Sequence, residues 1–269
     1  MRIKKSNNNS YVNESGFWIR DFTQIKNRSI DINKFFDKED MDLFIKNEKM
    51  NKRLMKATKP KEQKKVLIVS DGYALKEKQL FLDNIDNNTY VILTNNSIRY
   101  WELNHNIYLV NNPYEDCLKY MSSKIKNCLS SCRTNPNYLN KIKSNITLYQ
   151  PTKNSFYSGV YDWYNVKLDD YRSSITAALH YAYLMNPERI CLLCTDSCHE
   201  IKKPGMVQSF YGLYQYEQNF LSEKILDTML FWLLDKDVDV RIHSSGHEYK
   251  NAKYIEEENI LDFIGGKNE

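Results

Sequence analysis

The sequence predicts an α/β protein: a Rossmann-like, mostly parallel sheet with helices on both faces, plus a small helical N-terminal extension. Three observations lead to this prediction. Short runs rich in Val, Ile, Leu and Thr alternate with longer segments of helical periodicity. A chain of 269 residues can bury a sizeable core without disulfides or structural metals. The Lys/Pro/Glu stretch 58–64 has the composition of a linker, so we expect a partly helical extension over residues 1–60 and a Rossmann-like domain over residues 61–269.

The extension begins with residues 1–28, which are polar and irregular. Met41, Phe44 and Ile45 are then spaced so that they share one face of a helix. This pattern predicts a helix that begins near Asp37 and extends to Ala57.

The domain alternates strands with helices. The expected strands are 65–70 (KVLIVS), 89–94 (TYVILT), 107–110 (IYLV), 145–149, 189–195 (RICLLCT) and 238–243 (VDVRIH). The expected helices are 74–86, 97–103, 113–130, 173–185, 214–234 and 254–264, and a long aromatic loop continues from the strand 145–149 to about residue 170. Apolar, β-branched strands in alternation with helices are typical of a parallel sheet covered on both faces.

The charge balance excludes some classes of partner. Lys and Arg number 38 and Asp and Glu 34, a net charge of +4, so we expect no dedicated nucleic-acid binding. No run of eighteen apolar residues predicts a membrane span, and the basic start is not followed by the apolar segment of a secretory signal. We therefore expect no membrane partner and a cytoplasmic location.

The six cysteines allow two interpretations. Cys191 and Cys194 have the spacing of zinc ligands. However, they lie in an expected buried strand, where residues three apart point to opposite faces. Thiols packed in the core are therefore the favoured interpretation.

Polar residues follow most of the expected strands. In an open α/β sheet, ligands bind outside the carboxyl ends of the strands, so several of these residues are expected to line one site. They are Ser70, Asp71, Gly72, Thr94, Asn95, Asn96, Asn111, Asn112, Thr195, Asp196, His243, Ser244 and Ser245.

Two helix starts are candidate anion sites. After the first strand, Asp71, Gly72 and Tyr73 form a turn in which the glycine allows close approach of a ligand to the backbone. Asp71 would hold Mg²⁺, accept from a ribose hydroxyl, or simply cap the helix. The second start consists of Arg172, Ser173, Ser174 and Thr176, which either bind an anion or only cap a helix.

Asp196 and His243 are the candidate catalytic residues. Asp196 follows the most apolar strand, where its carboxylate would hold a metal, orient a hydroxyl or act as general base. His243 is a possible acid or base, and so are His199 and His247. The aromatic segment 155–166 would serve as a lid, as a stacking wall for a ligand, or as a plug of the core.

Three blocks together resemble one family. They are Gly72-Tyr73-Ala74-Leu75 after the first strand, TYVILTNNSIRYWELNHNIYLVNNP, and YRSSITAALHYAYLMNPERICLLCTDSC. They are similar to the archaeal 6-hydroxymethylpterin pyrophosphokinase-like proteins, a group that includes the motility-accessory-factor flagellin glycosyltransferases and resembles a bacterial sialyltransferase family. The resemblance covers residues 60–245 and departs from the pattern where Cys194 and Thr195 replace the glycine before Asp196.

The resemblance implies a Rossmann-like, nucleotide-dependent transferase. The residues that it implies as contacts of a nucleotide or its diphosphate are Gly72, Asn95, Asn96, Asn112, Ser173, Ser174 and Asp196. One expected reaction transfers diphosphate from ATP to a hydroxymethyl acceptor, with Mg²⁺ held by Asp196 and Asp71. The alternatives are a glycosyltransferase that uses a nucleotide-sugar, and a non-catalytic scaffold with residues 1–60 as a docking arm. The expected partners are a small nucleotide and its acceptor, and a homo-oligomer remains open.

Overall fold

The protein is described here from a computed structural model. The described residues are 4–5, 10–12, 18–20, 38–70, 84–94, 97–100, 105–114, 125–152, 164–170, 173–195, 200–203, 206–209, 212–215, 226–234, 236–243 and 249–265.

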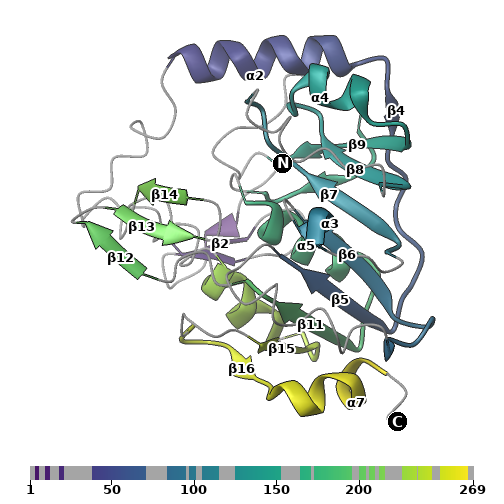
Figure 1. Ribbon diagram of the computed structural model, residues 1–269, viewed down its shortest axis with the longest axis vertical. Helices are drawn as coiled ribbons and strands as arrows, with labels where there is room; N and C mark the ends of the chain where they lie inside the picture. The colour runs from purple at the N-terminus through teal and green to yellow at the C-terminus, as the bar shows by residue number, and fades with distance from the viewer. Residues whose placement is uncertain are drawn as a thin grey trace.

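A ten-stranded sheet forms the centre of the fold (Figure 1). Its strands are β4 (Met55–Lys56), β5 (Lys65–Val69), β6 (Tyr90–Thr94), β7 (Ile107–Val110), β8 (Asn127–Ser131), β9 (Asn145–Pro151), β10 (Lys167–Leu168), β11 (Arg189–Leu193), β15 (Asp239–His243) and β16 (Lys253–Tyr254). The order is β10-β9-β8-β7-β6-β5-β11-β15-β16, and β4 also pairs with β9. Each pairing between described strands of this sheet is parallel, so the predicted mostly parallel sheet is confirmed.

The strand order reverses between β5 and β11. From β5 the chain proceeds through β6, β7, β8 and β9 on one side and then returns to place β11 on the other. Val69 pairs with Leu193 at the carboxyl ends of these two strands, and the Ser70 amide donates to the Leu193 carbonyl at 3.0 Å. Such a reversal is where open α/β sheets bind ligands.

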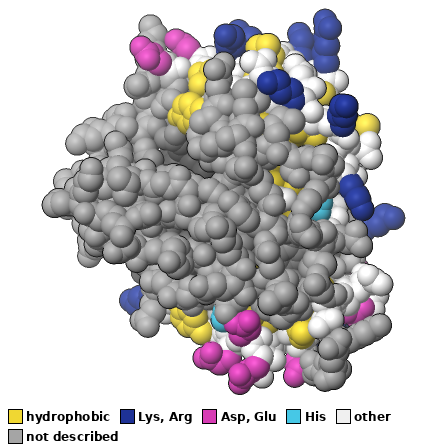
Figure 2. Space-filling model, in the orientation of Figure 1, with side chains coloured by type: hydrophobic (Ala, Val, Ile, Leu, Met, Phe, Trp, Pro, Cys, Tyr) yellow, Lys and Arg dark blue, Asp and Glu magenta, His cyan; other side chains and the backbone are white. Residues whose placement is uncertain are grey.

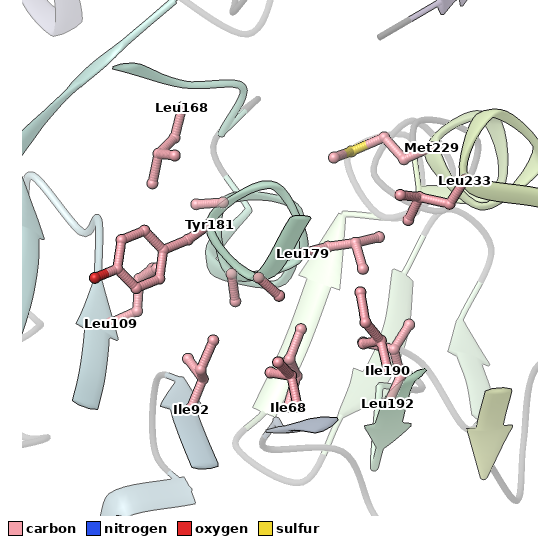
Figure 3. Packing of buried hydrophobic residues seen from close by; sticks show 14 of the residues in the cluster. Ile68, Ile92, Leu109, Leu168, Leu179, Tyr181, Ile190, Leu192, Met229 and Leu233 are labelled. Carbon is pink, nitrogen blue, oxygen red and sulfur yellow. The ribbon is translucent and has the colours of Figure 1, made fainter. Parts of the chain in front are cut away.

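Helices cover both faces of the sheet, as predicted. They are α2 (Lys38–Asn51), α3 (Ser97–Tyr100), α4 (Pro136–Lys141), α5 (Ser174–Tyr183), η5 (Glu257–Asn259) and α7 (Ile260–Ile264), together with helical residues 226–234. Because side chains alternate along a strand, Ile68 of β5 packs with α5 and residues 226–234, and its neighbour Leu67 packs in a second cluster with Ile98, Leu139 and Phe263. Figure 3 shows the first cluster, with Leu179 and Tyr181 of α5 above the strands.

Several predicted elements differ in the structure. The helix expected over 113–130 does not include a strand at its end, but residues 127–131 form β8, because this segment is enclosed between β7 and β9 and buried from Cys128 onward. No Gly or Pro separates it from the preceding helical pattern, so periodicity alone does not mark the change.

Two other predicted helices differ where they begin. Of the helix expected over 214–234, residues 226–234 are helical, residues 216–225 lie outside the described residues, and residues 214–215 belong to β14 (Gly212–Gln215), which pairs antiparallel with β13 (Met206–Ser209) beside β12 (Glu200–Lys203). The helix expected over 254–264 is preceded by β16 and starts as η5 before α7. Most of the expected helix 74–86 and of the aromatic segment 155–166 lies outside the described residues.

The N-terminal region contains more regular structure than predicted. Residues expected to be irregular include the antiparallel strands β1 (Lys4–Lys5), β2 (Ser10–Val12) and β3 (Trp18–Arg20). The helix expected to reach Ala57 ends at Asn51, and β4 then joins the sheet by pairing Met55 with Thr147. Tertiary pairing outweighs helix propensity at this end.

The described cysteines are core thiols, as predicted. Cys128, Cys132, Cys191 and Cys194 are buried and free, and burial raises the pKa of Cys191 to about 12. Within the described ranges no group of three or more His, Cys, Asp or Glu side chains is arranged to hold a metal ion. No helix there is long and apolar enough to cross a membrane.

Candidate functional site

The predicted site residues divide into two groups. Those within the described residues are Asn112, Ser173, Ser174, Thr176, Thr195 and His243. Those outside them are Asp71, Gly72, Tyr73, Asn95, Asn96, Arg172 and Asp196. The first group and the residues around it form the candidate site described below.

At the reversal of strand order, the sheet ends in buried hydroxyl groups. Ser70, Thr94 and Thr195 follow or end β5, β6 and β11, and each is at most 1% exposed. The Thr94 hydroxyl donates to the Val69 carbonyl at 3.3 Å, and the Tyr249 hydroxyl donates to the Thr195 carbonyl at 3.0 Å. The Thr195 hydroxyl itself has no hydrogen-bond partner within the described part of the chain. A buried unpaired hydroxyl costs free energy unless a ligand or water satisfies it.

Cys194, immediately before Thr195, has a strained backbone. Its φ is 55°, in the left-handed region that disfavours residues with a Cβ atom. The family that the sequence resembles has a glycine at this position, and glycine adopts a positive φ without strain. Backbone strain of this kind occurs often at ligand sites.

The start of α5 is capped by its own residues. Ser173 is the N-cap, and its hydroxyl accepts from the Thr176 amide at 3.5 Å. The Thr176 hydroxyl donates to the Asp170 carbonyl at 2.6 Å and lies 2.9 Å from the Ser173 carbonyl. The hydroxyls of Ser173 and Thr176 therefore cap the start of α5, which is the second of the two alternatives for this helix start.

Ser174 contacts Asn111, which follows β7. The Ser174 hydroxyl lies 2.8 Å from Asn111 Oδ1, and Asn111 is 5% exposed. The Asn111 amide nitrogen has no partner among the described residues. Reversing the two ends of the amide would pair its nitrogen with Ser174 and leave its oxygen without a partner, so one polar end is unsatisfied in either orientation.

Asn112 is one of the predicted ligand residues. Its side-chain oxygen accepts from the Tyr114 amide at 2.9 Å within the turn after β7, and its carbonyl accepts from the amide of Asn135, the N-cap of α4, at 3.1 Å. The structure therefore places Asn111, rather than Asn112, beside Ser174 at the α5 start.

His243 ends β15, one strand beyond β11. Its Nδ1 lies 3.0 Å from the Ile255 carbonyl, which can only accept, so Nδ1 carries the proton. Nε2 is then the nitrogen able to accept a proton from a substrate. His243 pairs in register with Leu193, which places it beside the reversal of strand order.

A buried ion pair lies beside the α5 start. One guanidinium nitrogen of Arg133 is 2.9 Å and 3.0 Å from the two carboxylate oxygens of Asp170, and both side chains are at most 1% exposed. The Tyr149 hydroxyl donates to the same carboxylate at 3.3 Å. Burial, and then the charge of Asp170, raise the pKa of Tyr149 well above its ordinary value.

The N-terminal helix α2 supports this ion pair. The Asn47 amide donates to the Pro113 and Arg133 carbonyls at 2.9 and 3.0 Å. The Asn51 amide donates to the Cys132 and Thr134 carbonyls at 3.0 and 2.7 Å. In addition, the Arg133 guanidinium lies 5.3 Å from the centre of the Phe44 ring.

A second buried carboxylate, Asp169, lies next to His180. The Asp169 amide donates to His180 Nδ1 at 2.8 Å, so Nδ1 carries no proton and Nε2 does. Burial lowers the pKa of His180 to about 3, and the neutral ring therefore forms no ion pair with the Asp169 carboxylate 3.6 Å away. The carboxylate instead accepts from the Thr152 hydroxyl.

Sequence reasoning missed Arg133, Asp169 and Asp170. The two aspartates lie at the end of the expected aromatic loop, and Arg133 follows β8, most of which the periodicity predicts as helix. A detectable signal was the short run VKL directly before two acidic residues and a serine-capped helix.

Comparisons with known proteins identify the fold. No family model matches the sequence, and no curated protein matches it. Among solved structures, a MAf glycosyltransferase from Magnetospirillum magneticum AMB-1 has a TM-score of 0.62 at 9% sequence identity. The match covers 81% of this chain but only 38% of the glycosyltransferase chain.

At this identity the likeness concerns the fold alone. It agrees with the predicted Rossmann-like α/β class and with the motility-accessory-factor branch of the sequence resemblance. These findings give no support to the pterin pyrophosphokinase branch. The chain thus shares the fold of a MAf glycosyltransferase and carries unsatisfied polar groups where such folds bind ligands.

Proposed function

We propose that the chain is a nucleotide-dependent transferase whose donor is a nucleotide-sugar. The observation that carries this proposal is the unsatisfied amide of Asn111 beside Ser174 at the start of α5. The N-terminus of a helix attracts anions through its unpaired amides and its dipole. A diphosphate or phosphate placed there would give the Asn111 amide nitrogen the acceptor that it lacks.

The length of the proposed site fits an extended ligand. Asn111 follows β7 and Thr195 follows β11, and three strand spacings separate these strands in the sheet. At 4.8 Å per spacing, the two residues lie about 14 Å apart along the edge. We propose that the ligand's phosphates occupy the α5 end and that another part of it accepts from or donates to the Thr195 hydroxyl.

The proposed reaction is displacement at the anomeric carbon of the donor sugar. The acceptor oxygen forms the new bond, and the bond between the anomeric carbon and the phosphate oxygen breaks. The acceptor proton passes to water, because His243 lies four strand spacings, about 19 Å, from Asn111 along the edge and is too far from an anomeric carbon whose phosphate is at the α5 start. The leaving nucleotide keeps the bonding electrons, and the α5 start stabilises its negative charge.

Diphosphate transfer from ATP is the competing reaction. It would place Mg²⁺ on Asp71 and Asp196, which are outside the described residues, and the described side chains contain no metal cluster of their own. Oxygen ligands from these aspartates fit the preference of Mg²⁺. The non-catalytic scaffold is the third possibility, and each of the three gives a different result in one experiment.

The experiment measures thermal stabilisation by CMP- and UDP-sugars, ATP and GTP, each with and without Mg²⁺. Stabilisation by a nucleotide-sugar supports the proposal, stabilisation by Mg²⁺ and ATP alone favours diphosphate transfer, and no stabilisation favours the scaffold. Asn111→Ala is expected to weaken nucleotide-sugar binding about tenfold, because it removes a hydrogen bond to a charged group. The matched variant Asn112→Ala should bind the same ligand with nearly unchanged affinity. Equal losses in both variants would overturn the assignment of Asn111.

A further inference from the structure

The amino ends of β4, β9 and β8 lie together, away from the candidate site. Met55 of β4 pairs with Thr147 of β9, and Asn145 of β9 pairs with Asn127 of β8. Because the three strands are adjacent and parallel, their starts lie within about 10 Å across one edge of the sheet. The candidate site is at the opposite, carboxyl edge.

Four exposed cations converge on this edge, which we call the basic edge. Lys52 and Arg53 precede β4, and Lys141 and Lys143 precede β9. Over the part of the chain that the structure describes, none of the four takes part in an ion pair. The sequence explains this, since residues 49–61 and 125–152 contain no Asp or Glu.

Several cations near other strands of the sheet form ion pairs. Lys64 bonds Glu188 at 3.0 Å, and Lys253 and Arg241 bond Asp239 at 3.2 and 3.0 Å. Figure 2 shows Lys and Arg side chains along the margin over α2, α4 and β9, and Asp and Glu side chains both over the start of α2 and near α7.

Apolar side chains accompany the basic edge. Met50, two residues before Lys52, is 53% exposed, and Met55 is 70% exposed. Cations beside exposed, flexible apolar side chains are the composition of surfaces that bind anionic lipid. Nucleic-acid sites instead combine cations with aromatic or amide side chains that contact bases.

We propose, against the expectation of no membrane partner, which rested on the lack of an apolar span, that the basic edge binds the protein peripherally to an anionic lipid surface. The ammonium and guanidinium groups face the lipid phosphates, and Met50 and Met55 reach the boundary of the acyl chains. Since binding there leaves the carboxyl edge of the sheet open, the proposal is independent of the proposed transferase function, and either can fail without the other.

The test is co-sedimentation with lipid vesicles. The full chain is expected to bind vesicles with about 30% phosphatidylglycerol at about 50 mM salt, and to leave them at about 500 mM salt as charges are screened. Vesicles of phosphatidylcholine alone should retain little protein. Lys52→Glu with Lys143→Glu is expected to lower vesicle partitioning at least thirtyfold.

The matched control is Lys236→Glu with Lys250→Glu, which changes the net charge equally on the flank of β15. This control should still bind, and Met50→Ser with Met55→Ser should bind more weakly at both salt concentrations. Absence of binding to the anionic vesicles, or an equal loss in the control, would overturn the proposal. Binding of a DNA duplex without binding of vesicles would assign the basic edge to nucleic acid and overturn it as well.

Discussion

At the scale of single residues, Cys194 combines a buried side chain with a backbone that suits glycine. Its φ of 55° places it in the left-handed region, and the side chain is 1% exposed. Left-handed geometry costs a residue with a Cβ atom about 1–2 kcal/mol. Replacing the thiol and removing the strain are separate effects, and two variants distinguish them.

Cys194→Ala and Cys194→Gly both lose the thiol, but only the glycine variant relieves the strain. We expect the free energy of unfolding in urea to be about 1 kcal/mol higher for Cys194→Gly than for Cys194→Ala. At a position with a negative φ, the glycine variant is ordinarily the less stable of the two proteins. The opposite order would show that the backbone at Cys194 relaxes without cost. Exposed Asn140→Ala in α4 provides the baseline for a surface change.

His180 predicts a pH dependence of stability. Its pKa falls to about 3 in the folded protein because it is buried, from an ordinary value of 6.5. Below pH 6.5 the unfolded chain binds a proton at His180 that the folded protein does not bind. The contribution of neutral, buried His180 to the free energy of unfolding is therefore complete above pH 6.5 and is lost as the pH falls toward 3. Between pH 7 and pH 5 the loss from His180 amounts to about 2 kcal/mol.

The check is urea unfolding of the wild type and of His180→Asn at both pH values. The Asn side chain can still accept from the Asp169 amide but does not titrate, so its loss between the two pH values should be smaller by about 2 kcal/mol. Identical losses in the two proteins would show that His180 is protonated in the folded state.

At the scale of elements, the sequence predicts the strands whose composition is itself strand-like. Runs such as 65–70 and 107–110 are rich in β-branched and aromatic residues, and both were located to within one residue. Asn127–Ser131 (NCLSS) lacks such residues and becomes β8 only because β7 and β9 enclose it. Pairing with strands distant in the sequence makes this segment a strand, so its local residue pattern does not predict it.

The candidate site shows the same division. The rule for strand ends predicted that polar side chains would gather at the carboxyl edge, and Asn111 and Thr195 do lie there. The pair of Arg133 and Asp170 was not predictable, because its partners are 37 residues apart and meet only through β8, β9 and β10. Such side-chain pairs depend on the register in which β8, β9 and β10 pair, and this register cannot be read from the sequence.

The Arg133–Asp170 pair joins the segment after β8 to the start of α5. Arg133→Ala leaves a buried carboxylate without its cation, and we expect a loss of about 3–5 kcal/mol in unfolding free energy. Arg133→Met combined with Asp170→Leu removes both charges but also the acceptor of the Tyr149 hydroxyl, so it should recover part of that loss. Recovery would show that the cost comes from the unpaired charge. A double variant as unstable as the single one would instead assign the cost to packing against Phe44 and Tyr149.

At the scale of the whole molecule, the proposed ligand site and the proposed lipid-binding surface lie at opposite edges of the sheet. Among the described residues, the carboxyl edge holds the unsatisfied groups of the candidate site, and the amino edge at β4, β9 and β8 holds cations without ion-pair partners. A ligand at one edge does not contact the other. Nucleotide binding and lipid binding are therefore expected to be independent, as they are for sites that share no contacts.

The span of the carboxyl edge leads to a prediction about ligand length. Asn111 and Thr195 both lie at this edge, on strands three spacings apart, about 14 Å. If one extended ligand reaches both, Asn111→Ala and Thr195→Val should each weaken binding of a full nucleotide-sugar, with additive effects because the two residues share no partner. Inorganic pyrophosphate is short enough to contact only the α5 end, so Asn111→Ala should weaken its binding and Thr195→Val should not. Calorimetric titration of both ligands against the two variants measures this, and a Thr195→Val variant that binds the full nucleotide-sugar like the wild type would confine the ligand to the α5 end.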